Sequence, residues 1–324
     1  MKVKIIIILG LLIGVENLWA FEKRIYPNIS IQRDFLKGPD FKEKVDIIKL
    51  EVDMELFFTK NSKLTIYPIQ EYNLSSKKGE FKFRKAYIGF LIKEVYCGIG
   101  KQPIIWGVGR GRNPTNYIKE IQPLEKQMEQ DVSQEGIDSF MLTFPIKGFT
   151  VENIVPFSNS SSFAMRAKTF LWDTDFSLSF YKYKDRLKVG GDFERGIGDL
   201  FGLYMESSFK DTKNYEGLIG ISRSLSSVHK SDIDLEYFIS QSGDKKEDYV
   251  FTQVTFSPRE DISLFNLLLF DLDKRITFFM PKLSYYLERM EFAVISTFKI
   301  KDNKEYVDYF PFDYIITTKI TYYF

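Results

Sequence analysis

Charged residues alternate with apolar residues over long stretches of this sequence, so their chemistry depends on which face of a sheet they occupy. Between Asp46 and Phe58 every second residue is apolar, and the positions between them include Lys49, Glu51, Asp53 and Glu55. Asp232, Asp234 and Glu236 have the same spacing. Side chains two residues apart on an extended strand share one face. Carboxylates in such a row could act as acid and base in a hydrolase, bind Ca²⁺, or form a polar lining.

Other reactive side chains are scarce. His229 is the only histidine and is expected in an exposed turn beside Lys230 and Ser231, so it is a poor base for a serine nucleophile. Cys97 is the only cysteine, so it cannot form an internal disulfide and is expected to be a small apolar residue on a strand. One histidine and one cysteine cannot build a metal site of the His/Cys type. We therefore expect no cofactor and no catalytic residue, while a carboxylate site for Ca²⁺ stays open.

The composition favours an all-β chain. Hydrophobic residues make up 44% and charged residues 27%, which is too polar for a bundle of membrane helices. Aromatic residues make up 16%, and they favour strands and membrane interfaces. A formal net charge of +1 lacks the basic surplus of a nucleic-acid-binding protein. We expect no nucleic acid among the partners.

The amino-terminal residues have the pattern of a secretory signal peptide. Lys2 and Lys4 precede an apolar run from Ile5 to Val15, and cleavage is expected after Ala20. The apolar run is too short to span a bilayer as a helix. The expected domain organisation is a signal peptide at 1–20 and a single barrel at 21–324.

From Ile25 to the end, the period-two pattern predicts eighteen antiparallel strands. Sixteen is the alternative, because Ile25–Phe35 and Leu187–Glu194 have the weakest patterns. One face of these strands is apolar and the other polar, which fits lipid outside and water inside a closed sheet without free edges. A soluble sandwich is the other possible reading. The expected lumen-lining residues are Lys49, Glu51, Asp53, Glu55, Arg166, Lys168, Glu206, Asp232, Asp234 and Glu236.

The last thirteen residues, Phe312 to Phe324, resemble the closing strand of bacterial outer-membrane β-barrels. Tyr322 and Phe324 share one face of this strand, and the chain ends on the aromatic residue. The resemblance implies that Phe324 and Tyr322 form a barrel-closure signal and that the last strand pairs with the first. It also implies an outer-membrane location in contact with lipid and lipopolysaccharide. Periplasmic chaperones and the outer-membrane insertion machinery would then assemble the barrel.

A second resemblance lies between Phe83 and Asn116. The segments Phe83–Phe90, Gly100–Gly107 and Asn113–Asn116 resemble a group of porin-like outer-membrane barrels and are similar in outline to barrels of the alginate-export type. In that group a strand ends in Gly-Arg-Gln, followed by Trp-Gly and an Asn-Pro-Thr-Asp-like turn. Here Lys101 replaces the arginine, Pro103 interrupts the strand, and Asn116 replaces the aspartate.

The long connection at 106–136 is the expected site of function, because long loops in compact domains are usually functional. Trp106 could lie at the membrane interface or fold inward. The loop could bend into the lumen, where its basic residues would face Glu51, Asp53 and Glu55 across a constriction. Alternatively, it could cover the mouth, with its charges paired to Glu120, Glu125 and Glu129. The expected constriction residues are Gln102, Trp106, Gly107, Arg110, Arg112, Asn113 and Lys119.

These patterns predict a passive porin-like channel for a hydrophilic solute, either monomeric or a homo-oligomer. Two alternatives remain open at this point. One is an outer-membrane hydrolase that uses carboxylates at the rim of the lumen, and the other is a sealed structural barrel plugged by the same loop.

Overall fold

The fold is built almost entirely of long strands. The computed structural model describes residues 22–37, 42–111, 113–118, 135–157, 162–184, 186–198, 201–211, 213–225, 230–273, 275–301 and 313–324. The predicted signal peptide at 1–20 and His229 lie outside these ranges. The strands are β1 (Glu22–Lys37), β2 (Lys42–Thr59), β3 (Ser62–Asn73), β4 (Lys78–Ile92), β5 (Val95–Gln102), β6 (Ile137–Ile146), β7 (Phe149–Pro156), β8 (Ser162–Leu171), β9 (Thr174–Tyr183), β10 (Arg186–Ile197), β11 (Phe201–Asp211), β12 (Asn214–Leu225), β13 (Lys230–Ser242), β14 (Lys245–Arg259), β15 (Ile262–Asp271), β16 (Ile276–Leu287), β17 (Met290–Lys301) and β18 (Tyr314–Tyr323).

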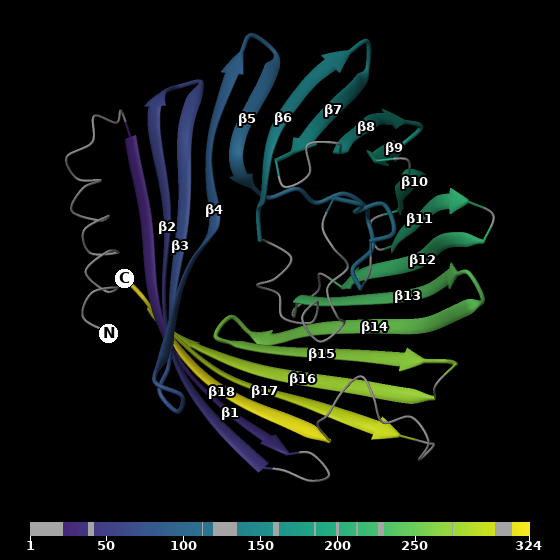
Figure 1. Ribbon diagram of the computed structural model, residues 1–324. Coiled ribbons are helices and arrows are strands. Elements are labelled where there is room, and N and C mark those ends of the chain that lie inside the picture. Colours follow the sequence, from purple (N-terminus) through teal and green to yellow (C-terminus); the bar gives the residue numbers. More distant parts are fainter. Residues whose placement is uncertain are drawn as a thin grey trace.

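The strands form one closed antiparallel sheet. Each strand pairs with the next in sequence, and β18 pairs with β1, so the 18-stranded sheet has no free edge (Figure 1). The predicted eighteen-stranded barrel is confirmed, and the sixteen-strand and sandwich alternatives are wrong. Among the described residues, no helix is long and apolar enough to cross a membrane.

The closing seam is regular over ten residue pairs. Ile31 lies opposite Ile320 and Ser30 opposite Thr321. The backbone N–H of Phe324 donates to the carbonyl oxygen of Pro27 at 3.1 Å. The rings of Tyr322 and Phe324 meet edge to face with centroids 4.8 Å apart. The first and last strands of the chain are therefore joined along most of their length.

The two faces of the sheet differ in polarity. Directly opposite residues share a face, so the inner face can be followed around the barrel: Asp192 lies opposite Glu206, and Glu206 opposite Leu218. Residues of the other parity point outward, and many of them are large, apolar and exposed. They include Phe163, Met165, Leu178, Val189, Met205, Ile219, Ile221, Ile233, Leu235, Leu268, Val294 and Ile320.

Two strands are affected by proline near their ends. β5 ends at Gln102, since Pro103 has no N–H to continue the ladder. β14 continues past Pro258 to Arg259. A register irregularity between Phe256 and Arg259 accommodates Pro258, because a bulge releases the strand from regular pairing.

The seam gives the first testable prediction. Thr318 pairs with Val294 on β17 and with Arg33 on β1, so its N–H belongs to a ladder with neighbours on both sides. We expect Thr318→Pro to remove that donor and lower the free energy of unfolding by about 1 to 3 kcal/mol. Urea unfolding in detergent micelles measures this difference. Thr318→Ala is the control, because it removes the side chain and keeps the N–H. Equal stability of the two variants would contradict the observed seam.

Candidate functional site

Residues 103–111 and 113–118, together called the inward segment, leave the end of β5 and run into the interior of the barrel (Figure 1). Gln102 fixes the exit point. Its side chain is buried, and its amide nitrogen donates to the carbonyl oxygen of Ser139 at 3.1 Å and to the Ser139 hydroxyl at 3.0 Å. The inner side of β6 (Ile137–Ile146) therefore holds the point at which the segment turns away from the wall.

An apolar cluster holds both ends of the inward segment against β7 and β8. Ile104, Trp106 and Tyr117 pack with Ile154 and Ala164, and all five side chains are buried. The indole Nε1–H of Trp106 donates to Glu152 Oε2 at 2.9 Å. Of the two positions considered for Trp106, the structure has the inward one.

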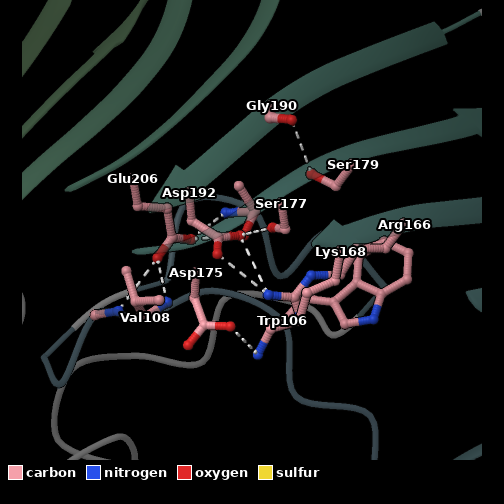
Figure 2. A network of polar contacts seen from close by, with 12 residues as sticks. Trp106, Val108, Arg166, Lys168, Asp175, Ser177, Ser179, Gly190, Asp192 and Glu206 are labelled. Atoms are coloured by element: carbon pink, nitrogen blue, oxygen red, sulfur yellow. Dashed lines mark hydrogen bonds and ion pairs between the residues drawn. The ribbon is translucent and has the colours of Figure 1, made fainter. Parts of the chain in front are cut away.

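The carboxylate of Glu206 binds the middle of the segment. Its Oε2 accepts the backbone N–H groups of Val108 at 2.9 Å and Gly109 at 3.2 Å (Figure 2). Its Oε1 accepts the Thr115 N–H at 2.5 Å and the Thr115 hydroxyl at 2.8 Å. The side chain is 1% exposed. Four donors converge on this one carboxylate, which is how a buried anion is stabilised away from water.

Glu236 binds the next part of the segment in the same way. Its carboxylate accepts the backbone N–H of Arg110, the N–H of Gly111 at 2.8 Å and the phenol of Tyr204 at 2.9 Å. This side chain is also 1% exposed. Glu206 and Glu236 lie on β11 and β13, so the segment is attached to two separate strands of the wall.

Glycine allows this close approach. Gly107 has a φ of +92°, and a Cβ there would lie 2.4 and 2.5 Å from the two carboxylate oxygens of Glu206. At Gly111 a Cβ would lie 2.8 Å from the ring of Phe251 and 3.0 Å from Glu236 Oε2. A side chain at either position would separate the backbone amides from the carboxylates.

Arg110 contacts acidic and aromatic residues of the wall beside the inward segment. Its guanidinium lies 3.4 Å from Glu194 Oε1 and 3.9 Å from Asp234 Oδ1, and above the ring of Tyr204. The backbone N–H of Arg110 donates to Glu236, which holds this residue against β10–β13, whereas Glu51, Asp53 and Glu55 lie on β2. The predicted field between the basic residues of this segment and the acidic row on β2 stays a prediction.

The acidic row on β2 has cations of its own. Glu51 pairs with Lys49 at 2.9 Å and with Arg84 at 3.1 Å, and Glu55 pairs with Lys63 at 2.6 Å. Arg112, Lys119 and the alternative partners Glu120, Glu125 and Glu129 lie outside the described residues.

The wall beside the segment holds a second polar network (Figure 2). Arg166 pairs with Asp192 at 3.2 Å, and the Ser177 hydroxyl donates to the same carboxylate. Lys168 lies 3.5 Å from Asp175. The charges of Arg166 and Lys168 are therefore each balanced by a neighbouring carboxylate.

Tyr117 lies near the carboxyl end of the inward segment. Its ring stacks on the ring of Tyr181 with the two centroids 6.1 Å apart, and Lys188 Nζ lies 5.6 Å from the centroid of the Tyr117 ring. A Cβ at Gly190 would lie 2.0 Å from the Tyr117 hydroxyl oxygen, so this glycine provides the space for the phenol. Burial raises the pKa of the Tyr117 phenol above its ordinary value.

The remaining predicted residues have the following positions. Asp232 is exposed on β13, on the same face as Asp234 and Glu236. The backbone carbonyl of Asn113 accepts the Asn116 N–H at 3.1 Å, which closes the turn before Thr115. Within the described ranges, no group of three or more His, Cys, Asp or Glu side chains is placed to hold a metal ion.

Sequence reasoning missed Glu152, Glu194, Tyr204 and Tyr117 as parts of this site. Glu152, Glu194 and Tyr204 lie on strands with the expected alternation, and Tyr117 lies on the inward segment itself. Nothing in the alternation shows which wall the segment contacts.

Solved structures of bacterial porins resemble this barrel. The barrel superposes on OccAB3 from Acinetobacter baumannii with a TM-score of 0.59 and 8% identity, over 94% of this chain and 99% of that one. A triple mutant of the Rhodopseudomonas blastica porin matches with a TM-score of 0.56 and 6% identity, over 94% of this chain and 100% of that one. The chain has a porin-like fold. At these identities the likeness concerns the fold alone, and the finer similarity to alginate-export barrels stays a prediction. No family model matches the sequence, and the search of curated proteins gives no match.

The attachment of the inward segment is testable. We expect Glu206→Gln to speed amide hydrogen exchange at Val108, Gly109 and Thr115 by about 10- to 100-fold, since an amide side chain replaces a charged acceptor whose bonds contribute roughly 1.5 to 3 kcal/mol. Asp232→Asn, which changes an exposed carboxylate on β13, is the control. Unchanged exchange at these three amides in Glu206→Gln would mean that the carboxylate does not hold the segment.

Proposed function

We propose that this protein is a porin-like channel of a bacterial outer membrane that passes a hydrophilic solute passively, with the inward segment as its constriction. The observation that carries this proposal is a closed 18-stranded barrel into which a long connection folds and binds the inner wall. The channel makes and breaks no covalent bond.

The outer face supports the membrane location. Large apolar side chains such as Leu178, Ile219 and Leu235 alternate with inward polar ones and stay exposed around the sheet. Soluble proteins rarely expose contiguous apolar surface on this scale. In hydrocarbon the same surface is favourable, and the closed ladder leaves the sheet without a free edge.

The inner face supports passage of a hydrophilic solute. Ion pairs and hydroxyl groups line it, including Arg166 with Asp192, Glu51 with Arg84, and Ser177 and Ser179. Barrels of this strand number are wide enough for an aqueous lumen. The inward segment narrows that lumen from one side, and Arg110, Glu194 and Asp234 place charges beside it. Such an arrangement selects solutes by size and by charge.

The location implies further partners, which belong to the same proposal. The outer face would contact lipid and lipopolysaccharide. The signal peptide would direct export, and periplasmic chaperones and the outer-membrane insertion machinery would assemble the barrel.

Planar-bilayer recording of the refolded protein tests the proposal. We expect stepwise insertion with steady ohmic conductance, reduced by neutral polyethylene glycols small enough to enter the lumen. Heat-modifiable migration on a gel confirms that the sample contains folded barrel. Folded, inserted protein that carries no current would overturn the channel proposal and leave a sealed barrel or an outer-membrane enzyme.

A further inference from the structure

A second polar site lies on the same wall as the inward segment. A pocket of about 340 Å³ opens on the inner side of β9–β13. Its lining residues are Tyr181, Tyr183, Arg186, Lys188, Ser208, Lys210, Asn214, Tyr215, Glu216, Ser240, Gln241 and Ser242. Several lie at strand ends: Tyr183 ends β9, Arg186 begins β10, and Ser242 ends β13. The pocket is therefore at the barrel end where β5 also connects to β6.

Positive charge predominates in this pocket. Arg186, Lys188 and Lys210 line it together with one carboxylate, Glu216. Lys188 and Lys210 are close neighbours across the ladder, since Val189 pairs with Phe209 directly beside them. Like charges in facing positions on adjacent strands repel each other. An anion bound between these two ammonium groups would remove that repulsion.

Aromatic rings form the adjoining side. Tyr181 lies opposite Lys188, and Tyr183 lies opposite Arg186, so each cation has a ring beside it on the neighbouring strand. Tyr117 of the inward segment stacks on Tyr181 and also contacts Lys188. Tyrosine faces bind flat apolar surfaces such as rings, while the hydroxyls of Ser208 and Ser240 can bond to polar groups.

We infer that this pocket binds a small organic anion that carries a carboxylate or a phosphate next to a ring with one apolar face. Its volume matches a solute of about monosaccharide size. The inference rests on the proposed function, because it makes the pocket the loading site for the constriction. A bound solute would lie beside Tyr181 and hence directly next to Tyr117, the last anchor of the inward segment.

Acidic side chains near the opposite end of the same strands indicate from which end of the barrel an anion would enter. Glu194 and Asp234 lie nearer the opposite ends of the same strands, beside Arg110, and Asp232 lies next to Asp234. The wall is thus basic at the pocket end and acidic at the other end. Anions are expected to enter the lumen from the pocket end.

Single-channel recording with added solutes tests the inference. The probes are glucose 6-phosphate, glucuronate and glucose, added to either side. We expect both anions to block the current, more strongly from the pocket side, and glucose to block at about tenfold higher concentration. Block by only one of the two anions would identify the group that the pocket recognises.

Variants locate the binding site. Lys188→Gln with Lys210→Gln is expected to weaken block by the anions about tenfold or more. Lys77→Gln with Lys78→Gln removes the same charge from the β3–β4 turn at the same barrel end and is expected to leave block unchanged. Arg186→Gln, at an exposed residue, replaces the double variant if that variant does not fold. Anion block unaffected by the pocket variants would overturn the inference.

Anion binding in the pocket can also be measured if the protein carries no current. Calorimetric titration of the folded protein in detergent with glucose 6-phosphate measures binding without conduction. Binding lost in the Lys188→Gln, Lys210→Gln variant would support the pocket even if the channel proposal failed. No binding to the parent protein would refute the pocket.

Discussion

Two buried carboxylates hold backbone amides of the inward segment, and the path of this segment inside the barrel depends on these contacts. Glu206 and Glu236 are each almost fully buried, and a buried carboxylate is costly unless donors surround it. The segment supplies those donors from its own backbone, and glycine at 107 and 111 lets the backbone come close enough. The segment thus stabilises the two buried carboxylates, and the carboxylates in turn hold the segment against the wall. Because the glutamates lie on different strands, the segment also resists rotation about either contact.

The closed ladder is what makes such an attachment possible. A sheet with a free edge could shift its register, whereas the seam between β1 and β18 fixes the position of every strand relative to the others. Glu206, Glu236 and Glu152 then lie at constant positions around one lumen. The pocket at Lys188 and Lys210 is made from the same strands, so the proposed solute site and the proposed constriction share one wall.

The sequence predicted the strands well, because alternation of side chains is a local property. Strands such as β2 and β13 are readable from their own residues, and even the weak patterns at Ile25 and Leu187 form strands. The backbone contacts of the inward segment with Glu206 and Glu236 were not predictable in the same way. They depend on donors in the backbone, which every sequence has, and on acceptors 91 to 126 residues away. The glycines at 107, 109 and 111 allow sharp turns, but a turn alone does not tell which wall it meets.

The most direct test is the single-channel conductance of the Glu206→Gln, Glu236→Gln double variant beside the parent protein in the same bilayer. Release of the inward segment predicts a larger and noisier conductance and entry of larger neutral polymers, with Asp232→Asn behaving like the parent. A double variant with the parent's conductance and the parent's size limit would contradict the account, because the two carboxylates would then have no part in shaping the pore.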